Sequence, residues 1–181
     1  ATGGIGGVHL NVENTNDVSA DLYALSENSN FVICSGAKSI LDLSKTNELL
    51  ETLGITRIGY QTNYMPGFWY EETENKVDNR FDEIHEISSF LKLNENIENK
   101  KSILIFNKVP LNKALNKNDV EKWINNAAIK ADRNNISGKE LTPFLIKEIN
   151  EESKNETLNA NISLIINNAN LAGKIAKNFY S

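Results

Sequence analysis

Lys38 is the residue whose position first suggests covalent chemistry. It follows an apolar run at residues 31–34, and three small residues at 35–37 separate the two. A short apolar run that ends near a glycine predicts a buried strand, and α/β folds bind ligands just beyond the carboxyl ends of such strands. Desolvation at that place favours the neutral amine, which is the form that attacks a carbon centre.

An ordinary structural role for Lys38 explains the same pattern. The residue could lie in the first turn of a helix and point into solvent, although the positive end of the helix dipole mildly disfavours a cation there. Local spacing does not choose between a nucleophile and a solvated lysine.

The glycine-rich segment at residues 2–9, Thr-Gly-Gly-Ile-Gly-Gly-Val-His, is a second candidate. Its four glycines would let backbone amides approach an anion closely. The spacing matches neither a dinucleotide fingerprint nor a phosphate loop, so a plain tight turn stays an alternative. His9 could act as a general acid or base, but a lone histidine near a turn is more often an ordinary hydrogen-bonding group. Because such a turn usually follows a strand, we expect the sequence to begin in the middle of a fold.

Asp17 and Asp21 lie four residues apart, so at the start of a helix they would share one face. Their simplest role is structural, with Asp17 capping the helix and Asp21 in its first turn. A functional role would place a hard metal ion on a carboxylate, with the Ser19 hydroxyl and nearby amides holding a phosphate. Taken alone, the spacing favours the structural role.

The composition limits the classes of protein that fit. A chain of 181 residues with 40% hydrophobic residues can bury one globular core. The net charge of −5 gives no general attraction for nucleic acid or an anionic membrane, and no stretch approaches the length of a membrane span. The single cysteine, Cys34, excludes an intramolecular disulfide, which indicates the cytoplasm or another reducing intracellular compartment.

Strand and helix patterns alternate along the chain. Short apolar runs predict strands at residues 31–34, 56–60 and 102–106, and helical spacing predicts helices at 39–53, 81–93, 118–131, from about Pro143, and 157–179. This alternation predicts an α/β fold, a layered α/β/α arrangement with a mostly parallel sheet. In the last helix the residues expected to face the core are Leu158, Ile162, Ile165, Ile166, Ala169, Leu171, Ile175 and Ala176.

Taken together, the segments resemble the pseudouridine-5′-phosphate glycosidase family, which includes the indigoidine-synthase-A-like proteins. The resemblance extends over most of the chain, and several motifs in the same order are more specific than any one of them. The motifs are ATGGIGGVH (residues 1–9), DVSADL (17–22), CSGAKSILDL (34–43), YQT (60–62), the stretch at 66–68, GKELTPFL (138–145) and LNANISLIINNA (158–169).

The resemblance implies reversible cleavage of the C-glycosidic bond of pseudouridine 5′-phosphate to uracil and ribose 5-phosphate, through a covalent lysine adduct. A carbon leaving group has no lone pair to protonate, so the usual scheme with two carboxylates does not apply. Carried over residue by residue, the resemblance makes Lys38 the nucleophile and His9 a second catalytic group. It makes Asp17 the ligand of a divalent metal, typically Mn²⁺. The substrate-binding residues that it implies are Thr2, Ser19, Ala20, Asp21 and Asn161.

The resemblance also implies a homotrimer. It further implies that some active-site residues of the family have no counterpart in this sequence. Family members carry an additional N-terminal portion with a glutamate proton donor and a second substrate-binding lysine, and neither maps onto this sequence. We therefore expect residues 1–181 to be the C-terminal part of a single glycosidase domain that is inactive alone. Two alternatives remain: a fragment or subunit that binds a sugar phosphate without turnover, and a different sugar-phosphate lyase or aldolase with the same imine chemistry.

Overall fold

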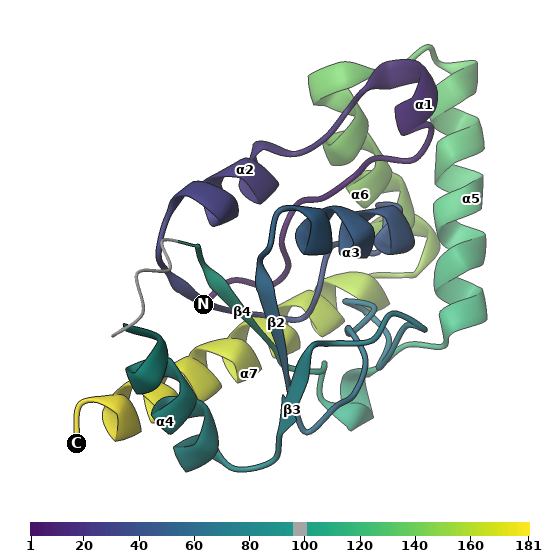
Figure 1. Cartoon of the computed structure of the whole chain (residues 1–181). Helices are drawn as coiled ribbons and strands as arrows, with labels where there is room; N and C mark the ends of the chain where they lie inside the picture. Colours follow the sequence, from purple (N-terminus) through teal and green to yellow (C-terminus); the bar gives the residue numbers. More distant parts are fainter. Residues whose placement is uncertain (96–100) are drawn as a thin grey trace.

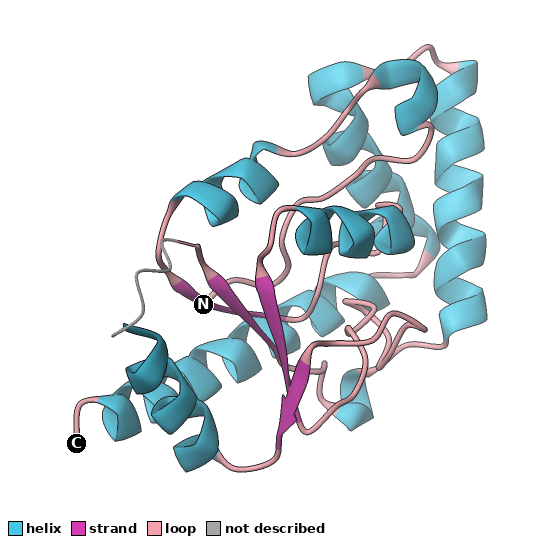
Figure 2. Ribbon diagram, in the orientation of Figure 1, coloured by secondary structure: helices cyan, strands magenta, loops and turns pink. Residues whose placement is uncertain are grey.

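A parallel sheet forms the centre of the computed structural model, which describes residues 1–95 and 101–181 (Figure 1). The strands stand in the order β1-β4-β2-β3, and all three neighbouring pairs are parallel. Figure 2 shows the strands in the middle with helices around them. The strands are Phe31–Cys34 (β1), Thr56–Tyr60 (β2), Asn79–Phe81 (β3) and Ile103–Phe106 (β4). The predicted α/β class with a mostly parallel sheet is confirmed.

The three predicted strands correspond to β1, β2 and β4, whereas β3 is not among them. β3 has only three residues, Asn79, Arg80 and Phe81, none of them buried, so it has no apolar run to reveal it. It exists because it pairs with β2 over its whole length.

Seven α-helices accompany the sheet in the described part of the chain, and none of them is both long and apolar enough to cross a membrane. They are Val12–Thr15 (α1), Ala20–Glu27 (α2), Leu43–Thr52 (α3), Ile84–Glu95 (α4), Lys117–Arg133 (α5), Leu141–Glu152 (α6) and Glu156–Phe179 (α7), with short 3₁₀ turns at Leu111–Lys113 and Gly138–Glu140.

The helix predicted over residues 39–53 begins four residues later than expected. Asp42 caps it, because the Asp42 carboxylate accepts a hydrogen bond from Lys45 N at 2.9 Å. α3 therefore starts at Leu43, and Lys38 lies in the loop before it. Lys38 therefore does not lie in the first turn of a helix, so that part of the structural alternative is wrong.

The core has two parts, one on each face of the sheet. Side chains alternate along a strand, so Ile103 and Ile105 of β4 pack with α4 and α7. Leu104 and Phe106 belong to the larger cluster on the other face, to which α3, α5 and α6 contribute. Figure 1 shows α4 beside the C-terminal end of α7, away from α5. All four β4 side chains are buried, which explains the unbroken apolar run in the sequence.

The face of α7 that packs on the core differs from the predicted one. Its buried stripe carries Leu164, Leu171 and Ile175 together with the polar Thr157 and Asn168. Of the eight residues predicted to face the core, only Leu171 and Ile175 are buried, and four are at least 43% exposed: Leu158, Ile162, Ile165 and Ile166. Because apolar residues occupy two stripes of this helix, residue type alone does not identify the stripe that is buried.

Asn168 is buried because its amide joins α7 to three other segments. Asn168 Nδ2 lies 2.8 Å from Thr2 O and 3.1 Å from Ser35 Oγ, and Oδ1 accepts a hydrogen bond from Asn107 Nδ2 at 3.0 Å. A carboxamide can make all these contacts because it both donates and accepts. Asn168 thus holds the glycine-rich segment next to the ends of β1 and β4.

We predict that Asn168→Asp lowers the free energy of unfolding by about 3 kcal/mol or more, because a carboxylate cannot donate to Thr2 O and would be a buried, unpaired charge. Denaturant unfolding followed by circular dichroism measures the change. Asn170→Asp is the matched control, since residue 170 is exposed on the same helix, and it should change the free energy by no more than about 0.5 kcal/mol. Equal losses in the two variants would contradict the role given to Asn168.

Candidate active site

The backbone around Lys38 is fixed by the glycine-rich segment, residues 2–9. Lys38 N donates to Ile5 O at 3.1 Å, and Ile5 N donates to Gly36 O at 3.0 Å. Ile5 and Ala37 form a parallel bridge, so the glycine-rich segment continues alongside the chain as it leaves β1. Lys38 is half-buried at the carboxyl end of the sheet, which is the edge where α/β folds bind their ligands.

The neighbouring nucleophilic side chains in this loop are unsuited to chemistry. Cys34 is fully buried, and burial raises the pKa of its thiol to about 12. Ser35 is buried against Asn168, and the Ser39 hydroxyl donates to Gly67 O at 2.6 Å. Lys38 Nζ, in contrast, makes no hydrogen bond or ion pair with any residue that the structure describes. Among the side chains of this loop, the Lys38 amine is thus the one left without a partner in the described part of the chain.

Five amides of the glycine-rich segment donate hydrogen bonds within the chain, whereas those of Gly3, Gly4 and Gly7 donate to no residue that the structure describes. Gly6 N donates to Asp21 Oδ2 at 2.7 Å and Val8 N donates to Thr46 Oγ1 at 2.9 Å. The glycines also permit close packing. A Cβ at Gly6 would collide with the Ser19 side chain, and a Cβ at Gly7 would collide with Thr46. The segment therefore positions neighbouring residues, and anion binding by its remaining amides stays a prediction.

The two aspartates point to different partners, so the shared helix face predicted for them is wrong. α2 begins at Ala20, and its N-cap is Ser19, whose Oγ accepts from Asp21 N at 3.2 Å. Asp17 lies before the helix, next to an antiparallel bridge between Val8 and Val18. The capping role predicted for Asp17 belongs to Ser19. Asp21 holds the glycine-rich segment through the Gly6 amide.

Asp17 lies beside the other predicted polar residue of this region, His9. The His9 Nδ1 and Asp17 Oδ2 atoms are 3.8 Å apart, and His9 N donates to Asp17 O at 3.0 Å. Both residues line an open pocket of about 710 Å³, with Gly138 and Thr142 on its other side. The pocket brings the motif at residues 138–145 to the glycine-rich segment, although more than a hundred residues separate them.

The donor set at Asp17 fits only one kind of metal site. The described residues contain no group of three or more His, Cys, Asp and Glu side chains that could hold an ion. Asp17 is a carboxylate with a side chain that is 38% exposed. A single exposed carboxylate suits a hard divalent ion that keeps most of its water ligands, and it does not suit a closed structural site.

Successive residues of the glycine-rich segment contact the other residues predicted for the site. Thr2 meets β1, since Thr2 N donates to Ile33 O at 3.0 Å. Ile5 accepts a hydrogen bond from Lys38 N, and His9 N donates to Asp17 O. Gly6 N donates to Asp21, and Gly6 packs against the N-cap Ser19. Thr2 and Ala20 are themselves exposed.

Asn161 lies on α7 and contacts the loop between β2 and β3. Its Oδ1 accepts a hydrogen bond from Trp69 Nε1 at 2.8 Å. Trp69, Thr46 and Asn168 are not among the residues predicted from the sequence. The aromatic cluster at residues 61–70 is the one signal that could have pointed to Trp69.

Known proteins resemble this chain in both sequence and fold. Residues 1–178 match the family described as indigoidine synthase A like protein. The pseudouridine-5′-phosphate glycosidase of Kosmotoga olearia is 47% identical over 176 residues, which are 97% of this chain and 60% of that protein. The enzyme of the same name from Petrotoga mobilis is 46% identical over 178 residues, 98% of this chain and 58% of that protein.

The fold comparison agrees with the sequence comparison. The crystal structure of the prealnumycin C-glycosynthase AlnA in complex with ribulose 5-phosphate matches with a TM-score of 0.92 and 31% identity, over 98% of this chain and 59% of that one. This chain thus spans about three fifths of the length of the relatives that it matches. With a match over residues 1–178, the chain belongs to the indigoidine synthase A-like family.

Proposed function

We propose that this chain is part of an enzyme that reversibly cleaves the C-glycosidic bond of pseudouridine 5′-phosphate to give uracil and ribose 5-phosphate. Relatives with that enzyme name at 46–47% identity support the proposal, and so does a structural neighbour solved with another pentose phosphate. Within the chain, the observation that carries it is Lys38. The residue is half-buried beyond the end of β1, on a backbone fixed by Ile5, and its amine has no partner among the described residues.

The chemistry requires an amine because the leaving atom is carbon. In the proposed route Lys38 Nζ bonds to C1′ as the C1′–O4′ bond breaks and O4′ takes a proton. The resulting secondary ammonium loses a proton, and the nitrogen lone pair then forms an iminium ion while the C1′–C5 electron pair moves into the uracil ring, which is protonated at C5. Water adds to C1′ and releases ribose 5-phosphate and the free lysine. The proton donor to O4′ is the glutamate that the sequence resemblance places outside these 181 residues.

Asp17 and the start of α2 are the proposed phosphate end of the site. The positive end of a helix dipole favours an anion, and Ser19, which caps Asp21 N, stands at that end of α2. A divalent ion bound at Asp17, which we take to be Mn²⁺, would supply positive charge opposite the phosphate. His9 Nδ1 lies 3.8 Å from the Asp17 carboxylate, and we keep His9 as the second catalytic group of the proposed site. We assign Asp21 to holding the glycine-rich segment, since its carboxylate already accepts from Gly6 N.

A second candidate function is binding of a sugar phosphate without turnover. The structural neighbour solved with ribulose 5-phosphate supports this candidate as well, because its fold binds a pentose phosphate. The homotrimer and the place of residues 1–181 at the C-terminal end of a single domain stay predictions. A different lyase or aldolase reaction would be revealed by turnover of uridine 5′-phosphate, an N-glycoside, without turnover of pseudouridine 5′-phosphate.

We predict that borohydride reduction in the presence of ribose 5-phosphate attaches the sugar to Lys38, as peptide mass mapping will show. Lys38→Arg keeps the positive charge but cannot form the imine, so its adduct should be undetectable. Lys45→Arg is the control and should keep the adduct, because Lys45 is exposed and pairs with Glu13 and Asp42. Labelling of another lysine in place of Lys38 would contradict the mechanism. Saturable binding without any adduct would favour the second candidate function.

A separate prediction concerns the metal. Asp17→Asn should weaken Mn²⁺ binding at least roughly tenfold, since even partners one shell farther from a metal change affinity by 10–100-fold. Electron paramagnetic resonance of free Mn²⁺ measures the affinity directly. Asp132→Asn, at an exposed position of α5, should leave it unchanged. Equal affinities of Asp17→Asn and the unmodified chain would exclude Asp17 as the ligand.

A further inference from the structure

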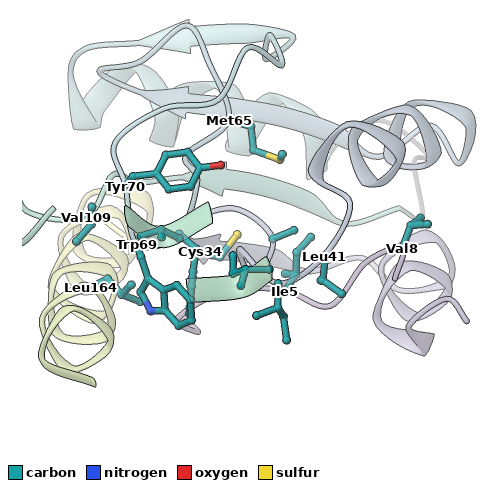
Figure 3. Close-up of a cluster of buried hydrophobic side chains, with 14 of the residues drawn as sticks. Ile5, Val8, Cys34, Leu41, Met65, Trp69, Tyr70, Val109 and Leu164 are labelled. Carbon is teal, nitrogen blue, oxygen red and sulfur yellow. The ribbon is translucent and has the colours of Figure 1, made fainter. Parts of the chain in front are cut away.

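Trp69 connects two parts of the candidate site that are far apart in the sequence. It lies in the loop between β2 and β3 and is only 2% exposed. Figure 3 shows it next to Leu164 of α7, within the core cluster. Its indole Nε1 donates to Asn161 Oδ1, also on α7, at 2.8 Å. A buried indole N–H needs an acceptor, and Asn161 supplies it.

The hydrogen bond fixes the orientation of the Asn161 carboxamide. The two ends of an asparagine amide have nearly the same shape, and their assignment depends on their partners. An indole N–H only donates, so the atom that faces Trp69 must be the oxygen. The NH₂ group of Asn161 is therefore at the other end, and no described residue accepts a hydrogen bond from it. Asn161 is partly exposed, so its two N–H donors are available to a ligand.

The loop that carries Trp69 is also attached on both sides of Lys38. Phe68 N donates to Ser35 O at 3.1 Å, and the Ser39 hydroxyl donates to Gly67 O at 2.6 Å. Gly36 has a φ of 83° and approaches Pro66 O so closely that a Cβ would not fit. Residues 66–69 thus connect the Lys38 loop to Asn161 through short contacts between buried groups, which leaves little freedom between the amine and the amide.

We propose that Trp69 is a positioning residue that holds the Asn161 carboxamide as a hydrogen-bond donor to an oxygen of the sugar phosphate, at a fixed separation from Lys38. The identity of the ligand rests on the proposed function. The ligand atom that meets Asn161 must be an acceptor, which a hydroxyl or phosphate oxygen is and an ammonium group is not.

Trp69→Phe tests the proposal, because it keeps an aromatic ring and removes only the donor. The readout is the affinity for ribose 5-phosphate by calorimetry, and the expected loss is about 3- to 10-fold, the range for one hydrogen bond. Asn161→Asp can still accept from Trp69 but cannot donate to the ligand, so it should lose at least as much. Trp123→Phe is the matched control: Trp123 lies half-buried on α5, and this variant should stay within about twofold.

A double-mutant cycle separates positioning from a structural role. If Trp69 acts through Asn161, Trp69→Phe should have no further effect on affinity in an Asn161→Ala background. An equal loss in both backgrounds would overturn the positioning role. The indole ¹⁵N–¹H resonance of Trp69 gives a readout without ligand, and it should shift and exchange faster with water in Asn161→Ala. An unchanged resonance would contradict the hydrogen bond itself.

The outcomes also separate this inference from the proposed function. If the unmodified chain binds no ribose 5-phosphate, the proposed function fails, and the ligand assigned to Asn161 fails with it. If the unmodified chain binds ribose 5-phosphate and Trp69→Phe binds it equally well, the proposed function stands and the role of Trp69 is wrong.

Discussion

The backbone pairing between the glycine-rich segment and the chain that leaves β1 is the constraint on which the candidate site depends. Ser35 N donates to Gly3 O at 2.8 Å, Lys38 N donates to Ile5 O at 3.1 Å, and Asp42 N donates to Val8 O at 2.9 Å. These bonds set the path of the loop that carries Lys38, from the end of β1 to the cap of α3. Because the groups are buried, leaving any of them unpaired would cost about 1–3 kcal/mol.

Glycine is what makes this pairing compatible with the surrounding packing. Three side chains from other parts of the chain occupy the space that a Cβ would need: Phe68 at Gly4, Ser19 at Gly6 and Thr46 at Gly7. Two of these contacts adjoin parts of the proposed site. Ser19 begins α2 at the proposed phosphate end, and Phe68 precedes Trp69, which orients Asn161. The glycine-rich sequence thus reflects the convergence of several elements on one strand-like segment, and an anion cradle is not needed to explain it.

The sequence predicts those features that depend on local pattern. The apolar runs predict β1, β2 and β4 well, and the position of Lys38 after β1 follows from its own neighbourhood. Features that depend on contacts across the chain are missed. The bridge between Val8 and Val18 keeps Asp17 outside the helix. The hydrogen bonds of the Asn168 amide allow this polar side chain to be buried. Trp69 and Asn161 meet across 92 positions of sequence, and no local spacing reveals such a pair. The order of motifs along the chain predicts the family more reliably than any single site residue.

A crystal structure of the chain with ribose 5-phosphate would test the central claim, that this backbone pairing presents the Lys38 amine to a sugar carbon. The account predicts continuous electron density from Lys38 Nζ to C1 of the sugar, with the loop path unchanged and the Asn161 NH₂ directed at a sugar-phosphate oxygen. A sugar phosphate bound elsewhere, or bound here with Lys38 turned into solvent, would contradict it.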